Sequence, residues 1–294
     1  MLSADWVDAG LLGLLGLLVG SFLNVVIYRL PKMMENQWAA ECAEMTASVA
    51  SDAAASTVAE PLGASPKPAF NLMVPRSRCQ QCGHQIRWFE NVPVVSYLLL
   101  RGKCSNCGTQ ISPRYPLVEL VTGGLFAWCA WKWGLSATAL TWCAFSAAIV
   151  ALAMIDWDTT FLPDDITLPL LWGGLIAAAL KLTAVGLPAS LWGAVVGYLS
   201  LWGVYWAFKL ITGKEGMGYG DFKLFAALGA WFGWQALIPI ILMASVIGAI
   251  VGIAMKFSSG LREGGYIPFG PFLAGAGLTA MFFGPAAILQ FVGL

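Results

Sequence analysis

The feature that most constrains this chain is an uncharged apolar run near its N-terminus, LLGLLGLLVGSFLNVVIY at residues 11–28. As an α-helix, this run would be about 27 Å long, which is close to the hydrocarbon thickness of a bilayer. The preceding segment, MLSADWVDAG, is acidic rather than basic, and no small-residue cleavage pattern follows the run, so it does not resemble a cleaved signal peptide. We therefore expect a retained transmembrane helix.

The remaining sequence favours several more membrane spans. The chain is 59% hydrophobic and only 11% charged, which lies outside the usual balance of soluble proteins. Charge, Pro or Gly bounds further apolar segments at 117–135, 137–156, 166–183, 187–210, 222–236, 237–257 and 271–291. The stretch 222–257 can also be divided differently. The sequence thus predicts an all-α polytopic membrane protein with about eight transmembrane helices.

One polar region interrupts this membrane core. Residues 31–115 carry fourteen charged residues, whereas the much longer stretch 116–294 carries fifteen. We therefore expect three parts: a first transmembrane helix at 1–30, a polar domain at 31–115, and a membrane-embedded core of about seven helices at 116–294. Within the polar domain, residues 38–68 are rich in Ala, Ser and small polar residues, a composition typical of a flexible or loosely helical insertion.

The distribution of basic residues indicates the orientation. If the N-terminus lies outside the cytoplasm, all but two of the 16 Lys and Arg residues, Lys132 and Lys181, fall on the cytoplasmic side. The polar domain is longer than the loops of roughly 60 residues that this rule describes best, but the later short loops show the same bias. We expect the polar domain between helices one and two to be cytoplasmic.

Two Cys-x-x-Cys-Gly motifs in the polar domain, CQQCGH at 79–84 and CSNCGT at 104–109, have the spacing of a tetrahedral zinc site. The predicted ligands are Cys79, Cys82, Cys104 and Cys107. Two disulfides or four unrelated thiols are the alternatives, but disulfides rarely persist in a reducing cytoplasm. Four thiolates would close the coordination sphere and make the zinc structural, with His84 as a bystander. We expect the remaining thiols, Cys42, Cys129 and Cys143, to be buried and inert.

Two aspartates are placed unusually. Asp156 follows the apolar run AIVALAMI, and Asp221 follows the glycine-rich GMGYG at the start of another apolar segment. Counting the crossings between them puts both at the same depth on the cytoplasmic face. Such a carboxylate pair can share one proton, so that the ionised member activates water while the protonated member polarises a carbonyl group. Helix capping or solvation is the alternative, and it fits the neighbouring acids Asp158, Asp164 and Asp165.

Several motifs spread along the chain resemble those of type IV prepilin peptidases: GSFLNVVIYRLP, the paired Cys-x-x-Cys motifs, RYPLVEL, the ID and LPD pair, GMGYGDFKL and IPFGPFLAGAG. The resemblance implies a bifunctional inner-membrane enzyme of the glycine-x-glycine-aspartate protease class. With the orientation indicated by the basic residues, its N-terminus would be periplasmic. Such enzymes cleave the basic leader from prepilins and pseudopilins at the cytoplasmic face, then methylate the new N-terminal amine with S-adenosylmethionine. Matching the motifs makes Asp156 and Asp221 the catalytic pair.

The methyl donor site rests on this resemblance alone. GMGYG is not preceded by a strand, so it does not fit the dinucleotide-binding fingerprint. The cytoplasmic domain is our hypothesis for its location. As partners we expect prepilins, pseudopilins and the lipid bilayer, and no nucleic acid. The acids available to receive the basic leader are Glu35, Glu41, Glu44, Glu90 and Glu119.

Two other functional classes compete with this one. A proton-coupled transporter would use the paired aspartates as a relay, but no further acid continues the path outward. A noncatalytic scaffold with a zinc-organised docking domain would leave the aspartates unexplained. The amide of Asn24, inside the first apolar run, is expected to hydrogen-bond between helices, although positioning of substrate is a second reading.

Overall fold

The computed structural model describes residues 2–53, 70–214, 216–257 and 267–292. These residues form helices and two isolated β-bridges, and no strand occurs among them. The helices are α1 (Leu2–Ala53), α2 (Val95–Leu99), α3 (Arg114–Trp133), α4 (Ala137–Thr159), α5 (Asp164–Ala179), α6 (Leu187–Thr212), α7 (Tyr219–Phe232), α8 (Leu237–Phe257), α9 (Gly270–Phe283) and α10 (Pro285–Val292). Two short 3₁₀ turns, at Trp88–Asn91 and Trp234–Ala236, complete the described elements. The predicted all-helical class is confirmed.

Each apolar segment expected from the sequence coincides with a helix. The last one is divided, because Gly284 ends α9 with a φ of 82° before α10 begins. Four helical segments are long and apolar enough to cross a membrane: Trp6–Thr46, Ala137–Thr159, Leu187–Thr212 and Trp234–Phe257. The apolar helix α9 is shorter than these. The described helices therefore confirm a membrane protein with several spans.

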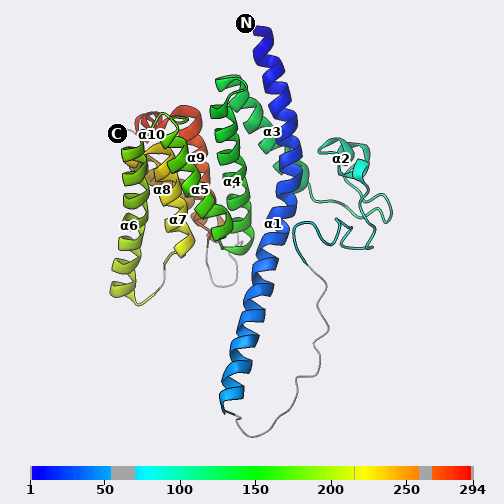
Figure 1. Ribbon diagram of the computed structural model, residues 1–294, viewed down its shortest axis with the longest axis horizontal. Coiled ribbons are helices and arrows are strands. Elements are labelled where there is room, and N and C mark those ends of the chain that lie inside the picture. The colour runs from blue at the N-terminus through cyan, green and yellow to red at the C-terminus, as the bar shows by residue number, and fades with distance from the viewer. Residues whose placement is uncertain (1, 54–69, 215, 258–266, 293–294) are drawn as a thin grey trace.

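Helix α1 differs from the expectation in its length. It runs without interruption from Leu2 to Ala53, with Pro31 inside it, so no break separates the membrane span from residues 31–53. Figure 1 shows this long helix, with the segment that contains α2 on one side and helices α4 to α10 on the other. The rest of the predicted insertion, residues 54–68, lies outside the described residues, as do Lys67 and Arg262, which entered the orientation argument.

Helices α1 and α3 pack side by side. The Asn24 side chain donates a hydrogen bond from Nδ2 to the backbone oxygen of Tyr115 at 3.1 Å, which confirms the predicted interhelical role of this amide. On the other side of the molecule, α6 packs on α7 at Gly193 and Gly229. A Cβ atom at Gly193 would lie 2.1 Å from the backbone oxygen of Gly229, so only glycine allows this approach.

Aromatic side chains fill the core between α4 and α7. Phe145 and Trp231 have ring centroids 4.8 Å apart, and Trp142 lies 5.2 Å from Trp231. The indole nitrogen of Trp231 donates a hydrogen bond to the backbone oxygen of Leu170 at 2.8 Å, which ties α5 to α7. Because a buried indole needs an acceptor, this bond fixes how α5 lies on the bundle.

Candidate active site and metal centre

Asp156 lies in the last turns of α4 and is only 4% exposed. The helix ends just beyond it, at Thr160, which adopts a left-handed conformation. The backbone N–H of Thr160 donates a hydrogen bond to the backbone oxygen of Asp156 at 2.8 Å. The carboxylate Oδ2 accepts a hydrogen bond from the backbone N–H of Gly270, at the start of α9, at 2.9 Å. A Cβ atom at Gly270 would lie 2.6 Å from this oxygen. Glycine is therefore required for the contact between α9 and the carboxylate.

Asp221 lies in the first turn of α7 and is 7% exposed. Its helix begins after Gly218, which has extended backbone angles. The neighbouring Gly220 packs against Leu162, whose Cβ atom would lie 2.7 Å from an added Cβ. The Oδ1 atom of Asp221 is buried and has no hydrogen-bond partner among the described residues. A buried carboxylate oxygen left in this state is costly for folding and indicates a functional position.

The two aspartates meet where three helices converge. Leu162, in the turn after α4, packs against both Gly220 of α7 and Gly270 of α9. The carboxylates of Asp156 and Asp221 are close enough to interact electrostatically. The structure thus brings together two acids that are far apart in sequence, at the end of α4 and the start of α7. Their catalytic roles remain a prediction.

Two of the neighbouring acids pair with cations. Asp158 forms two hydrogen bonds of 2.7 Å with the guanidinium of Arg114, which joins α4 to α3. Asp164 accepts hydrogen bonds from Lys223 at 2.7 Å, which joins the start of α5 to the start of α7. Both carboxylates remain partly exposed, so solvation accompanies these ion pairs, and Asp164 lies in the first turn of α5. Asp165 is exposed.

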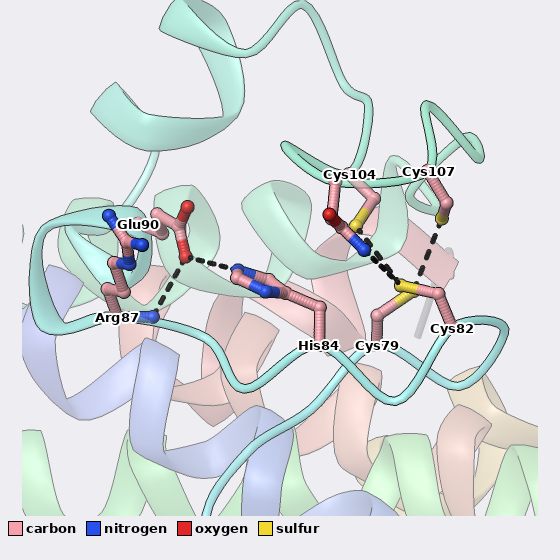
Figure 2. A network of polar contacts seen from close by, with 8 residues as sticks. Cys79, Cys82, His84, Arg87, Glu90, Cys104 and Cys107 are labelled. Carbon is pink, nitrogen blue, oxygen red and sulfur yellow. Dashed lines mark hydrogen bonds and ion pairs between the residues drawn. The ribbon is translucent and has the colours of Figure 1, made fainter.

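The four predicted cysteine ligands form one cluster. All four Sγ atoms lie within 4.8 Å of one another; those of Cys79 and Cys107 are 3.8 Å apart, and those of Cys82 and Cys104 are 4.0 Å apart. Zinc–sulfur bonds of 2.3 Å in a tetrahedron require separations of about 3.8 Å. Figure 2 shows the four side chains converging from two loops. The cluster can therefore hold a metal ion, and its geometry fits zinc.

The two loops have the same local structure. Gly83 and Gly108 have φ angles of 71° and 70°, as expected for glycines in tight turns, and each donates its N–H to the backbone oxygen of the first cysteine of its motif at 3.0 Å. The hydroxyl of Thr109, 3.2 Å from Cys107 Sγ, lowers the pKa of that thiol to about 6. A lowered pKa favours the thiolate that metal binding requires.

His84 lies beside the cluster but contacts a different partner. Its Nε2 atom is 3.3 Å from Oε2 of Glu90. Hydrogen bonds from the backbone of Arg87 and the side chains of Ser105 and His84 lower the pKa of Glu90 to about 2. Among the other thiols, Cys129 and Cys143 are buried as predicted. The prediction is wrong for Cys42, which is exposed on the extended part of α1.

Two buried charged residues hold the cysteine-bearing segment against the membrane helices, a role that the sequence did not predict for either of them. Arg29 of α1 donates to the backbone oxygens of Asn71 and Pro75 at 2.9 and 2.6 Å. Glu119 of α3 accepts the backbone N–H of Val94 at 2.7 Å. Arg29 and Glu119 both lie in the quoted motifs, and a charge just inside an apolar helix was the available signal.

The other acids considered for the basic leader differ in position. Three of them are exposed on the part of helix α1 that continues past the apolar run: Glu35, Glu41 and Glu44. Glu90 and Glu119 are instead engaged with His84 and with Val94.

Known proteins resemble this chain along most of its length. The bacterial peptidase A24 N-terminal domain matches residues 14–133, and the type IV leader peptidase family matches residues 142–253. Proteins named prepilin leader peptidase/N-methyltransferase from Stutzerimonas stutzeri and Pseudomonas aeruginosa are 52% and 51% identical, in each case over 95% of this chain and 93% of the relative. A protein of the same name from Burkholderia pseudomallei is 49% identical over 92% of this chain and 84% of the relative. No solved structure shows significant similarity. The chain therefore belongs to the type IV leader peptidase family.

Proposed function

We propose that this chain is a membrane-embedded aspartic peptidase that cleaves the basic leader from type IV prepilins and pseudopilins and then N-methylates the new N-terminal residue. The names of the relatives support both activities. The observation that carries the peptidase assignment is the buried pair, Asp156 and Asp221, with an unpartnered carboxylate oxygen on the second. A pair of interacting carboxylates beside a bilayer is the chemistry that hydrolysis of an amide bond at this depth needs.

The pair would act as a coupled acid and base. The ionised carboxylate takes a proton from water, and the water oxygen attacks the carbonyl carbon while the protonated carboxyl donates a hydrogen bond to the carbonyl oxygen. The amide C–N bond then breaks, and the leaving nitrogen takes up a proton, which gives a carboxylate leader and a free amine. The backbone N–H of Gly270 donates a hydrogen bond to Oδ2 of Asp156 and so helps to hold this carboxylate in place.

The free amine is the substrate of the second reaction. S-adenosylmethionine, when bound, would supply the methyl group that this nitrogen accepts, with release of one proton. We propose that the cytoplasmic domain contributes to this step and that its four cysteines hold a structural zinc ion. Replacing Cys79 and Cys82 while assaying cleavage and methylation separately tests the assignment. Selective loss of methylation supports it, whereas equal loss of both activities indicates simple unfolding.

The proposed location is the bacterial inner membrane, with about eight spans, a periplasmic N-terminus and the aspartate pair facing the cytoplasm. The coincidence of the expected segments with helices and the bias of Lys and Arg support this topology. The proposed parts are the first span at 1–30, the cytoplasmic domain at 31–115 and the catalytic core at 116–294. Labelling of single introduced cysteines from each side of sealed vesicles tests this topology.

The deciding experiment compares purified variants on a prepilin substrate in detergent. Wild-type protein cleaves the substrate, whereas Asp156→Ala and Asp221→Ala abolish cleavage. The matched control is Asp8→Ala, which removes a carboxylate from the N-terminal part of α1 and leaves the rate unchanged. If either Asp156→Ala or Asp221→Ala cleaves the substrate at the wild-type rate, the pair is not catalytic.

A proton-coupled transporter is not favoured by the arrangement of acids. Helices α4, α7 and α9, which converge at the pair, carry no further acid towards their other ends. A relay across the bilayer would need such groups.

A further inference from the structure

An apolar groove of about 480 Å³ runs between α4 and α5. Its floor contains Phe145 and Trp231, whose rings pack together. Its walls carry small side chains in pairs spaced by one helical turn: Ala144 and Ala148 on α4, and Gly173 and Ala177 on α5. In lipid, small residues on facing helices allow another helix to approach closely. The groove therefore has the surface of a helix-binding site.

The groove has a single charged residue among those that line it, and this residue sits at one end. Asp165, in the first turn of α5, lines the groove and is exposed. The preceding residue, Asp164, binds Lys223, two residues after Asp221. The charged end of the groove is therefore fastened to the helix that begins at the candidate active site. From Asp165 to Ala177, α5 presents about 18 Å of groove wall, enough for roughly twelve helical residues of an occupant.

We propose that this groove docks the substrate, with the apolar segment that follows the cleavage site lying between α4 and α5 and a basic residue of the leader facing Asp165. The inference rests on the proposed peptidase function. It is favoured by charge complementarity, because the one acid among the lining residues attracts a cationic residue of the leader. It is also favoured by shape, since the small residues on both walls allow a helix to approach closely. The polarity follows: the charged end of the substrate lies beside the aspartate pair.

The first test fills the groove. A Cβ atom at Gly173 would meet only Trp231, at an ordinary contact distance of 3.7 Å, so Gly173→Leu occupies the groove without a backbone clash. The matched control is Gly203→Leu on α6, where an added Cβ has no neighbour within 4 Å among the described residues. We expect Gly173→Leu to raise the KM for a prepilin about tenfold or more and Gly203→Leu to leave it unchanged. Equal KM values for the two variants overturn the inference.

The second test exchanges charges. Asp165→Lys should reduce cleavage of a substrate with a basic leader, and a substrate whose leader cation nearest the cleavage site is replaced by Glu should regain cleavage with this variant. Asp165→Asn, which keeps the shape, should show a smaller loss. If Asp165→Lys cleaves the basic and acidic leaders with the wild-type preference, Asp165 does not face the leader.

A binding readout separates the occupants. In the Asp221→Asn background, a photoreactive residue at Ile176 in the groove should cross-link the apolar segment of the substrate, whereas one at Val204 on α6 should not. Capture of lipid alone, or of a second copy of this chain, at position 176 in the presence of substrate overturns the inference. If substrate is cross-linked at 176 but wild-type protein cleaves nothing, the peptidase function fails and docking stands. If wild-type protein cleaves the substrate but Gly173→Leu does not change the KM, the docking inference fails and the peptidase function stands.

Discussion

The contact between Glu119 and Val94 gives a sharp prediction about how the cysteine-bearing segment is held. Val94 has a φ of 59°, a conformation that a β-branched residue adopts only when its surroundings impose it. The carboxylate of Glu119 accepts its N–H at 2.7 Å and also interacts with the Ser21 side chain. Glu119 therefore connects α1, α3 and the segment that begins α2. We expect Glu119→Leu to release this connection.

The cost can be worked out from the groups involved. A hydrogen bond to a charged acceptor contributes about 1.5–3 kcal/mol, and the strained backbone of Val94 costs about 1–3 kcal/mol that the contact must offset. We expect Glu119→Leu to lower the free energy of unfolding by about 2–3 kcal/mol, and Glu119→Gln, which keeps an acceptor oxygen, by about 1 kcal/mol. At about 2–4 °C per kcal/mol, the Leu variant should melt about 4–12 °C below the wild type.

Two measurements check this expectation. Thermal unfolding in detergent can be followed by the fluorescence of the 14 Trp residues. Hydrogen exchange of the segment around Val94 should accelerate in Glu119→Leu and much less in Glu119→Gln. A Leu variant that melts at the wild-type temperature, with unchanged exchange around Val94, would refute the reasoning.

Three further predictions concern other parts of the molecule. Gly193→Ala should lower the free energy of unfolding by about 3 kcal/mol, because its Cβ would lie 2.1 Å from the oxygen of Gly229; Gly203→Ala is the control, and equal melting temperatures would contradict this packing. Cys104→Ser should abolish stoichiometric zinc in metal analysis of the purified protein, and undiminished zinc would exclude the four-thiolate site. The cleavage rate should fall at both low and high pH, because one carboxylate must be ionised and the other protonated; a rate that is constant from pH 4 to 9 would argue against a shared proton.

The predictions that agree with the structure rest on three patterns in the sequence: the spacing within short motifs, the number of helices between two residues, and the apolar surroundings of a polar residue. The four cysteine ligands follow from two short motifs, since the turn that aims each sulfur atom is contained within six residues. The juxtaposition of Asp156 and Asp221 follows from counting helices, because an even number of crossings returns the chain to the same face. Asn24 was assigned an interhelical bond from its apolar surroundings alone, and the structure supplies the partner, Tyr115.

Contacts between distant residues could not be predicted in the same way. The N–H group of Gly270 that donates to Asp156 belongs to the backbone, so no side chain in the sequence could predict this hydrogen bond. Two ion pairs, Asp158 with Arg114 and Asp164 with Lys223, depend on how neighbouring helices are rotated about their axes. The hydrophobic pattern of the sequence does not determine this rotation. Cys42 is exposed because α1 continues past its apolar run.

The bonds from Arg29 to Asn71 and Pro75 have a consequence for how this chain tolerates changes in length. From Arg29 the helix α1 continues to Ala53, about 36 Å further on, yet Arg29 also holds the backbone where the cysteine-bearing segment begins. Arg29 and Asn71 are thus in contact although they are 42 positions apart in the sequence. Insertions or deletions in the sequence between these two residues need not displace the thiolates or the aspartates. This stretch is therefore a suitable place to insert a tag or reporter.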